Sequence, residues 1–398
     1  GNEMERKTVC IVTGTRAEWG LLRGVCRAMQ EREELCVKVA VTGAHLSEAF
    51  GMTVHEVERD GAPIDVRIPI LEYGTDSREA MAKTTALAME RFTDYFSKTK
   101  PDAVLVLGDR YEIFAAGSAA AMLCIPVIHI SGGDVTYGAV DEWIRHSLTK
   151  MAALHFPSCE VYAKRVIQMG ESPDRVFNVG GLGDENLRKL PLMSKETLEK
   201  SIEFSLAEPY LLVTYHPETA SGNDARACFD ALAKALLETS CRIIFTKANA
   251  DAGGRAINEA IDELCKRDPK RMIAFTSMGL LRYLSAMKYC AAVVGNSSSG
   301  VVEAPTLRVP VVNIGTRQAG RILCENVVSC GDSTEEIRRA LSTALSPEFR
   351  QKADGTKSPY DGGDTAKRIA QETVRFLNRP DCGAPKVFYD MPTGEAKC

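Results

Sequence analysis

The sequence lacks the signature motifs of the common cofactor-binding folds. It contains no Gly-x-Gly-x-x-Gly dinucleotide fingerprint and no Walker A sequence, so the usual loops for nicotinamide cofactors and ATP are missing. It also has no Cys-x-x-Cys pair, no His-x-x-x-His pair and no EF-hand pattern, which argues against the common zinc and calcium sites. We therefore expect neither a metal nor an organic cofactor.

Long apolar runs are missing as well. No stretch of about 18 apolar residues occurs, and the polar N-terminal residues have no signal-type apolar region behind them, so we expect a cytoplasmic protein without a membrane contact. The formal net charge of -4 gives no overall field that favours nucleic acid. The cysteines fall singly within apolar stretches, which predicts reduced, mostly buried thiols.

What the sequence does contain is enough apolar material for two cores. The chain has 398 residues, of which 45% are hydrophobic and 26% charged, and this length fits two domains of roughly 150 to 200 residues each. Short β-branched runs alternate with longer amphipathic stretches. Nearly continuous apolar strands separated by helices predict a parallel sheet that is covered on both faces.

The predicted strands form two sets, and most end in polar residues and glycine. They are residues 8–13, 36–42, 103–107 and 126–130 in the first half, and 210–214, 242–245, 291–294 and 309–314 in the second. We therefore expect an α/β protein with two doubly wound domains that face each other across a cleft, at residues 1–185 and 186–365. A C-terminal helix and tail, residues 366–398, are expected to pack back on the first domain. Ligands of such sheets gather at the carboxyl ends of the strands.

The strongest phosphate-binding candidate is the small-residue turn at residues 295–300, because its backbone N–H groups and hydroxyls could face an anion. Glu303 is expected one turn into the following helix, where it could accept ribose hydroxyls; an ordinary helix-start charge is the alternative. Arg317 and Arg321 could supply positive charge. The turn at residues 14–18 offers a further cation.

The densest polar cluster is expected near two strand ends of the first domain. Its members are Asp109, Asp134, Asp141, Glu142, Arg145 and His146, with His216 at a strand end of the second domain. Crowded or desolvated carboxylates can have their pKa raised from about 4 toward neutrality, so that one donates a proton while another accepts. The alternative is that Asp141 and Glu142 cap a helix, with Arg145 and His146 as ordinary i+4 partners. His45 could face the cleft or lie in the core.

Taken in order along the chain, these motifs resemble those of the hydrolysing UDP-N-acetylglucosamine 2-epimerases of sialic acid synthesis, both the bacterial enzymes and the epimerase half of the animal bifunctional enzyme. The resemblance covers nearly the whole chain. Its markers are Gly-Thr-Arg-Ala-Glu (14–18), Thr-Gly-Ala-His-Leu (42–46), Gly-Asp-Arg (108–110), Ile-Arg-His-Ser-Leu-Thr-Lys (144–150), Gly-Asn-Ser-Ser-Ser-Gly (295–300) and Asn-Ile-Gly-Thr-Arg-Gln (313–318).

The resemblance implies a GT-B architecture, a reaction without metal ions and the following chemistry. The C2 proton is removed as UDP leaves anti from C1, which gives 2-acetamidoglucal, and water then adds to release N-acetylmannosamine and UDP. The residues implied to hold UDP are Arg16, Arg110, Asn249, Ser297, Ser298, Gly300, Glu303 and Arg317. Those implied to surround the sugar are Asp109, Asp134, Asp141, Glu142 and His216, supported by His45, Arg145 and His146. The family also implies a homodimer or homotetramer.

One position departs from the pattern of the animal enzyme. Where that enzyme has an acidic residue directly before a Gly-Gly pair, this chain has Ser131, and Asp134 follows the pair instead. Either Asp134 takes over the proton transfer or the sugar differs. UDP-N-acetylglucosamine is the expected substrate. The alternatives are the related 2-epimerases that hydrolyse UDP-2,4-diacetamido-2,4,6-trideoxyglucose for legionaminic acid synthesis, a non-hydrolysing 2-epimerase, and a GT-B glycosyltransferase.

Overall fold

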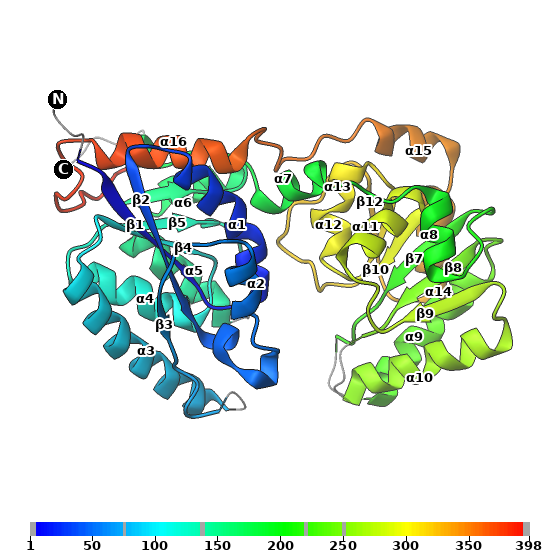
Figure 1. The fold of residues 1–398 in the computed structure, drawn as a ribbon. Helices are drawn as coiled ribbons and strands as arrows, with labels where there is room; N and C mark the ends of the chain where they lie inside the picture. Colours follow the sequence, from blue (N-terminus) through cyan, green and yellow to red (C-terminus); the bar gives the residue numbers. More distant parts are fainter. Residues whose placement is uncertain (1–4, 75–76, 136–139, 219–221, 249–251, 393–398) are drawn as a thin grey trace. The chain divides into compact units, whose positions relative to one another are not determined.

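The chain folds into two compact α/β units. The computed structural model describes residues 5–74, 77–135, 140–218, 222–248 and 252–392. One unit consists of residues 1–186 with 359–398, and the other of residues 187–358. Each contains a six-stranded sheet (Figure 1). None of the helices in the described ranges combines the length and the apolar character needed to cross a membrane.

The sheet of the first unit has the order β3-β2-β1-β4-β5-β6, and its paired strands are parallel. Its strands are β1 (Lys7–Thr13), β2 (Leu35–Thr42), β3 (Ile64–Ile68), β4 (Ala103–Leu107), β5 (Val127–Ile130) and β6 (Leu154–Phe156). The helices are α1 (Arg16–Gln30), α2 (Val54–Arg59), α3 (Arg78–Thr99), α4 (Tyr111–Met122), α5 (Val140–Met151), α6 (Glu160–Gln168) and α16 (Thr365–Leu377). Helix α7 (Leu182–Lys189) spans the boundary between the units.

The second unit repeats this plan with the order β12-β11-β10-β7-β8-β9. Its strands are β7 (Tyr210–Thr214), β8 (Arg242–Thr246), β9 (Met272–Phe275), β10 (Ala292–Gly295), β11 (Val311–Ile314) and β12 (Val327–Cys330). The helices are α8 (Lys195–Ile202), α9 (Gly222–Leu237), α10 (Ala252–Arg267), α11 (Leu280–Tyr289), α12 (Ser299–Val302), α13 (Ala304–Leu307), α14 (Thr334–Ala344) and α15 (Pro347–Asp354). Both sheets therefore reverse their winding in the middle, between β1 and β4 and between β7 and β10, where ligands of such folds bind.

Each sheet is buried on both faces, as the apolar strands predict. Along β1, Val9 and Ile11 belong to one core and Cys10 and Val12 to the core on the other face. This alternation follows from the two-residue period of a strand. The second unit shows the same division between the two faces of β7.

The sequence predictions match the eight inner strands, but they omit β3, β6, β9 and β12, which are the edge strands of the two sheets. In strand β3 Ile68 is buried while the other residues are partly or fully exposed, and β12 has no fully buried residue. Strand β6 is buried but only three residues long. Edge strands need less apolar surface, so their sequences lack the continuous apolar runs that mark the inner ones.

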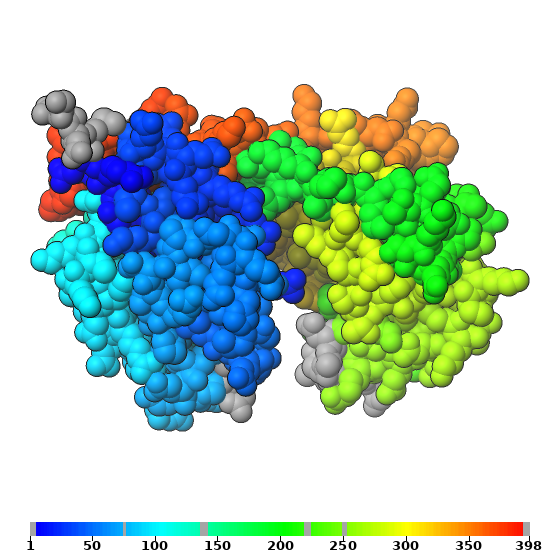
Figure 2. All heavy atoms as spheres, in the orientation of Figure 1, coloured from blue at the N-terminus to red at the C-terminus, as the bar shows by residue number. Residues whose placement is uncertain are grey.

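Helix α16 belongs to the core of the first unit, although it follows the second unit in the sequence. Its residues Ile369, Ala370 and Val374 lie in the same apolar cluster as Trp19 and Leu22 of α1. In the space-filling view the orange-red residues of α16 lie against blue residues of the first unit (Figure 2). Helix α16, near the end of the chain, therefore completes the core of the unit that begins with β1 and α1.

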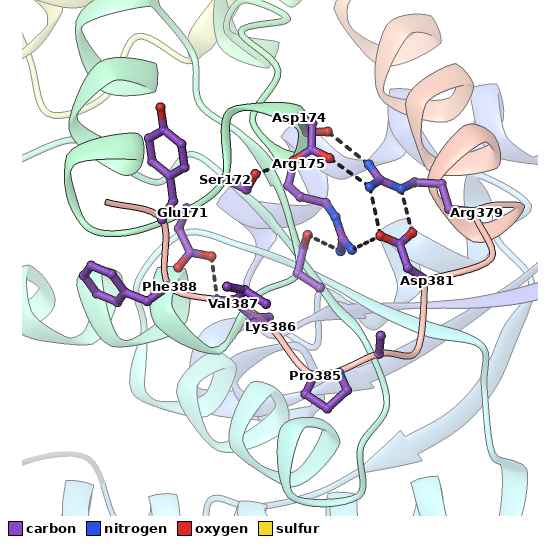
Figure 3. A pocket seen from close by; sticks show the side chains of 13 residues that line it. Glu171, Ser172, Asp174, Arg175, Arg379, Asp381, Pro385, Lys386, Val387 and Phe388 are labelled. Carbon is purple, nitrogen blue, oxygen red and sulfur yellow. Dashed lines mark hydrogen bonds and ion pairs between the residues drawn. The ribbon is translucent and has the colours of Figure 1, made fainter. Parts of the chain in front are cut away.

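Beyond α16 the tail crosses the segment at residues 170–175 and is fixed there by ion pairs (Figure 3). Arg379 contacts Asp174 at 2.8 Å and Asp381 at 2.9 Å. Lys386 Nζ lies 2.5 Å from Glu171 Oε1. A cavity of about 400 Å³ remains beneath the tail. It lies beside the amino end of β6, at the edge of the sheet opposite to the carboxyl ends of the strands, so we assign these contacts a structural role.

Glu171 is the centre of this anchor. Its side chain is buried and accepts hydrogen bonds from Lys150 Nζ (2.6 Å) and interacts with His155 Nε2 (2.7 Å) as well as with Lys386. Burial alone would raise the pKa of Glu171, but the contacts with His155, Lys150 and Lys386 outweigh it and lower the pKa to about 2. The carboxylate therefore stabilises the fold when it is ionised.

We expect Glu171→Gln to lower the free energy of unfolding by about 3 kcal/mol at pH 7, because the depressed pKa stabilises the folded state above the ordinary carboxyl pKa. The loss should shrink as the pH falls from about 4.5 toward 2, where the native carboxylate becomes protonated too. Urea denaturation at several pH values measures it. Glu90→Gln on the exposed face of α3 is the matched control, with an expected effect below about 0.5 kcal/mol. Equal loss at all pH values would contradict the assignment.

Candidate active site

The first polar cluster forms where β4 and β5 end side by side. Leu107 pairs with Ile130 at the last position of the two strands, and Gly108 N donates to Ile130 O at 3.2 Å. The backbone then turns away from both strands, and Gly108 adopts a left-handed conformation with φ of 91°. This register brings Asp109 to the same sheet edge as the turn at residues 131–134.

That turn depends on its two glycines. A Cβ atom on Gly133 would lie 2.3 Å from the carbonyl oxygen of Tyr162, and one on Gly132 would lie 2.8 Å from Thr149 Oγ1. Gly133 also has φ of 87°, a conformation that side chains disfavour. Ser131 occupies the left-handed region as well, with φ of 72°. The tight backbone packing explains why Gly-Gly follows β5 in this sequence.

The guanidinium group of Arg145 holds the cluster together. Arg145 lies on α5 and exposes only 5% of its side chain. Its Nη2 atom donates to Asp109 Oδ2, and its Nη1 atom donates to Glu142 Oε2 at 3.1 Å and to the backbone oxygen of Asp134 at 3.1 Å. One buried cation thus binds the end of β4, the turn after β5 and the first turns of α5. Two neighbouring carboxylates are tolerated here because this charge lies between them.

Two histidines border this arrangement. Nε2 of His146 lies 2.7 Å from Glu142 Oε1, so the second carboxylate oxygen of Glu142 is also engaged. His129 is buried within β5, and its Nε2 atom lies 2.9 Å from the oxygen of Gly108. Burial lowers the pKa of His129 to about 4, which keeps the ring neutral near pH 7. His129 therefore supports the strand end and adds no positive charge to it.

Asp134 is placed at this site chiefly through its backbone. Its Oδ1 atom accepts a hydrogen bond from the N–H of Val135 at 2.7 Å, while its carbonyl oxygen binds Arg145. The backbone of Asp141 lies in α5, but its side chain lies outside the described residues, as does the whole of Asn249. The structure thus brings together Asp109, Asp134, Glu142, Arg145 and His146 of the predicted cluster.

A second acidic pair lies at the neighbouring strand ends, and the sequence predictions did not single it out. Glu18 and Glu112 expose 6% and 1% of their surface. Glu18 Oε1 accepts from Gly14 N at 2.8 Å, and Glu112 Oε1 accepts from Arg110 Nε at 2.5 Å. The Oε2 atoms of both are buried, and among the described residues they have no hydrogen-bond partner.

A repeated spacing could have revealed this pair. The strand ends of β1 and β4 are both followed by Gly-x-Arg-x-Glu, at residues 14–18 and 108–112. Because β1 and β4 are adjacent at the point where the sheet reverses its winding, the two motifs meet. A Cβ atom on Gly14 would lie 2.9 Å from Glu112 Cγ, which shows how closely the two turns pack. Each glutamate also looks like an ordinary first-turn helix charge, which hides it in the sequence.

Two further predicted residues, Arg16 and His45, lie at these turns in different environments. Arg16 is exposed, with Nε 3.2 Å from Glu56 Oε2. His45 is fully buried and joins Thr13 and Thr53 through its two ring nitrogens, and burial lowers its pKa to about 4. It is therefore a neutral histidine that supports the strand ends.

In the second unit the side chain of Asn296 organises the strand end of β10. Asn296 is fully buried. Its Oδ1 atom accepts from His216 N, and its Nδ2 atom donates to His216 O, both at 2.8 Å. Gln318 Nε2 donates to the oxygen of Asn296 at 3.1 Å. Gly295 before it must be glycine, since a Cβ atom there would lie 1.8 Å from the oxygen of Thr214.

The predicted phosphate turn is present, and two short helices follow it. Ser298 occupies the N-cap position of α12, which ends at Val302, and α13 begins at Ala304, so that Glu303 lies at the junction between the two helices. Pro305 in the first turn of α13 explains the break. Burial raises the pKa of Glu303. Glu303 therefore follows the turn by one helical turn, as expected, but it lies at the end of α12 rather than inside a helix.

The remaining predicted groups of this unit lie around the same strand ends. Ser297 is half-buried, Ser298 exposed and Gly300 buried. Arg317 is exposed, and its backbone N–H and that of Thr316 both donate to Glu218 Oε1 at 3.0 Å. The carboxylate of Glu218 thus fixes the turn that carries Arg317. Nothing in these contacts restricts the guanidinium group, which suits a cation that binds a ligand.

Two doubly wound units with polar, glycine-rich strand ends define a GT-B-like α/β protein, as expected from the sequence. The model for the family of UDP-N-acetylglucosamine 2-epimerases matches residues 27–373. The chain belongs to this family.

Relatives and a solved structure agree. The chain is 39% identical to the GDP/UDP-N,N'-diacetylbacillosamine 2-epimerase (hydrolyzing) of Campylobacter jejuni, over 98% of this chain and 100% of that protein. Identity is 37% to polysialic acid biosynthesis protein P7 of Escherichia coli, over 97% and 98%, and 32% to the UDP-N,N'-diacetylbacillosamine 2-epimerase (hydrolyzing) of Legionella pneumophila, over 92% and 95%. The UDP-GlcNAc 2-epimerase of Neisseria meningitidis, solved with UDP-GlcNAc, has the same fold, with a TM-score of 0.77 at 21% identity over 92% of this chain and 100% of that one.

Glu18 gives a pH-dependent prediction. Burial and the neighbouring Glu112 raise the pKa of Glu18 to about 8, from an ordinary value of 4.5. The protonated form therefore stabilises the fold, fully below about pH 4.5, and this contribution is lost as the pH rises through about 8. Glu18→Gln keeps an acceptor for Gly14 but cannot ionise. We expect the stability of the wild type to fall relative to that of the variant by up to about 1.4 kcal/mol per pH unit in this window.

Urea denaturation between pH 5 and 9 measures this difference, with Glu90→Gln again as the control. A difference between wild type and Glu18→Gln that stays constant across these pH values would show that Glu18 is ionised in the native protein.

Proposed function

We propose that the chain is a hydrolysing 2-epimerase of UDP-N,N'-diacetylbacillosamine, the UDP-linked 2,4-diacetamido-2,4,6-trideoxyglucose. It would release UDP and the free sugar with inverted configuration at C2. The observation that carries this proposal is the identity of 39% over nearly the whole chain to a relative named for this reaction. The comparisons thus favour the alternative named above over UDP-N-acetylglucosamine as the substrate.

The chemistry is the same for both sugars. In the first step the C2–H bond and the bond between C1 and the UDP oxygen break, a C1=C2 double bond forms, and the bonding electrons of C1–O leave with UDP. In the second step a water hydroxyl adds to C1 and a proton adds to C2. Removing this weakly acidic proton requires a positioned base, and the leaving diphosphate requires positive charge or N–H donors.

We assign the proton transfers to Asp109, Asp134, Asp141 and Glu142 with His216. We assign UDP binding to the residues of the second unit that the sequence predicts for it, together with Arg16 and Arg110; they are Asn249, Ser297, Ser298, Gly300, Glu303 and Arg317. The contacts of Arg145 support the first assignment, because they fix Asp109 and Glu142 while both stay partly exposed, at 27% and 23% of their side chains. A fixed, accessible carboxylate pair suits a reaction that takes a proton from one face of the sugar and returns one to the other. The turn at residues 295–300 and Arg317 support the second.

UDP-N-acetylglucosamine remains the second candidate substrate. It is supported by the identity of 37% to a polysialic acid biosynthesis protein over 97% of the chain. The two proposals share every step at C1 and C2 and differ only in the groups at C4 and C6 of the sugar.

The deciding experiment is NMR of the products formed from each UDP-sugar, and from the GDP-linked diacetamido sugar, without added metal. We expect free 2-epimerised sugar and UDP from UDP-N,N'-diacetylbacillosamine, with kcat/KM at least about 10-fold above that for UDP-N-acetylglucosamine, the scale of an apolar pocket's discrimination. The reverse preference would select the second candidate. A product that stays UDP-linked would indicate the non-hydrolysing reaction, and turnover that requires an acceptor would indicate a glycosyltransferase.

Variants separate the two halves of the assignment. Glu142→Gln and Asp109→Asn should lower kcat by roughly 100-fold or more, as removal of a general acid or base does, with UDP affinity nearly unchanged. Arg317→Ala should weaken UDP binding by about 1.5 to 3 kcal/mol, the size of a hydrogen bond to a charged group. Steady-state kinetics and calorimetry measure these effects. Near-normal turnover would remove that carboxylate from the mechanism, and unchanged UDP affinity would reject the role of Arg317.

A further inference from the structure

A cavity of about 570 Å³ opens in the first unit at the carboxyl ends of β1, β2 and β4. Its wall has an apolar part, formed by Ala17, Ala44, Phe50, Leu71, Met81 and Tyr111, and a polar part, formed by Thr15, Arg16, Thr53 and Arg110. Phe50 leaves 50% of its surface exposed, so its ring is accessible from the cavity. The volume exceeds what one sugar ring needs, and it lies within the range of small-molecule sites.

The cavity begins next to the proposed proton-transfer site. Arg110 and Tyr111 line it, and they follow Asp109 directly in the chain, where neighbouring Cα atoms are about 3.8 Å apart. Arg110 is held by Glu112 at 2.5 Å and lies over the ring of Tyr111, 5.4 Å from its centroid. A sugar with its C2 at Asp109 can therefore reach the cavity with the substituents on the far side of its ring.

The two candidate sugars differ in the groups that would enter. UDP-N-acetylglucosamine carries hydroxyls at C4 and C6, whereas the diacetamido sugar carries an acetamido group at C4 and a methyl group at C6. A hydroxyl that loses water against the apolar part of the wall without a hydrogen-bond partner is disfavoured. A methyl group in the same place is favoured because its burial removes apolar surface from water. The apolar part of the wall therefore favours the diacetamido sugar.

The cavity also offers a polar group suited to an amide. Thr53 lines it, and Thr53 Oγ1 lies 2.8 Å from Nδ1 of the buried His45, whose Nε2 lies 2.9 Å from Thr13 Oγ1. This chain of contacts fixes the hydroxyl of Thr53 at the wall. A hydroxyl can donate once and accept twice, so it retains hydrogen-bonding capacity for an acetamido group.

We propose that this cavity receives the C4 acetamido and C6 methyl groups of the sugar and so selects the substrate, an inference that rests on the proposed function. Phe50, Leu71 and Met81 supply the apolar contacts, and the hydroxyl of Thr53 binds the C4 acetamido group. The residues that transfer protons are separate from those that choose the sugar.

The test compares kcat/KM for UDP-N,N'-diacetylbacillosamine and UDP-N-acetylglucosamine in the wild type, Leu71→Asn and Phe50→Ser. Each variant places a polar group in the wall. We expect each to lower the ratio of the two kcat/KM values at least about 10-fold, with UDP affinity unchanged. Leu123→Asn is the matched control: this exposed residue follows the far end of α4, roughly 18 Å from Tyr111 along the helix axis, and it should leave the ratio unchanged.

The outcomes distinguish the two proposals. A wild type that prefers UDP-N-acetylglucosamine, or converts neither sugar, overturns the proposed function and this inference with it. A wild type that prefers the diacetamido sugar, with variants whose ratio falls less than about 10-fold, upholds the proposed function and overturns the role of the cavity. Because Phe50 is half exposed, Phe50→Ser keeps the test valid if Leu71→Asn folds poorly, and urea midpoints verify folding of both.

Discussion

The buried guanidinium of Arg145 is the interaction on which the candidate active site depends. It binds Asp109 from the end of β4, Glu142 from α5 and the backbone of Asp134 from the turn after β5. A buried charge is tolerated only when partners satisfy it, and here the partners include the two carboxylates to which we assign proton transfer. The same contacts therefore neutralise the site and set its geometry. Without the cation, the two carboxylates would repel each other, and α5 would lose these links to Asp109 and Asp134.

In the second unit, neutral amide groups fix the ends of β7 and β10. The amide of Asn296 satisfies both backbone groups of His216, and Gln318 satisfies the backbone of Asn296. This arrangement fixes the strand ends of β7 and β10 without placing charge among them. A nucleotide diphosphate is an anion, so these amide and N–H groups, together with the exposed Arg317 on the turn that Glu218 fixes, suit the nucleotide binding that we propose for this unit. The two units share a fold, while their strand ends differ in the groups that fix them.

The sequence predicts the inner parts of the fold better than the outer parts. The eight inner strands carry continuous apolar runs because both their faces are buried, whereas β3 and β12 are partly solvated and resemble loops. For the site, the glycines that follow β5 and precede the turn at residue 296 mark positions where the backbone leaves no room for a side chain. The sequence predictions did not single out Glu18 and Glu112, because the helix dipole already explains an acidic residue in the first turn of a helix. Only the adjacency of β1 and β4 shows that these two side chains lie close together. Pro305, by contrast, was a readable signal for the break at Glu303.

The choice of substrate was the part that the proton-transfer residues could not decide. In the proposed reaction, elimination and hydration involve C1 and C2, where both candidate sugars are identical, so the assigned carboxylates and Arg145 would serve either one. Discrimination would then come from surfaces that touch C4 and C6, and in the cavity that we propose for this role the apolar residues are scattered over several loops. Ala44, Phe50, Leu71 and Met81 come from separate segments, and each on its own is indistinguishable from a core residue in the sequence. Chemistry at a reacting carbon needs ionisable side chains at a defined spacing, and a sequence displays that spacing. Selection against a hydroxyl needs a wall that offers this hydroxyl no hydrogen-bond partner, and such a wall is recognised only in the folded structure.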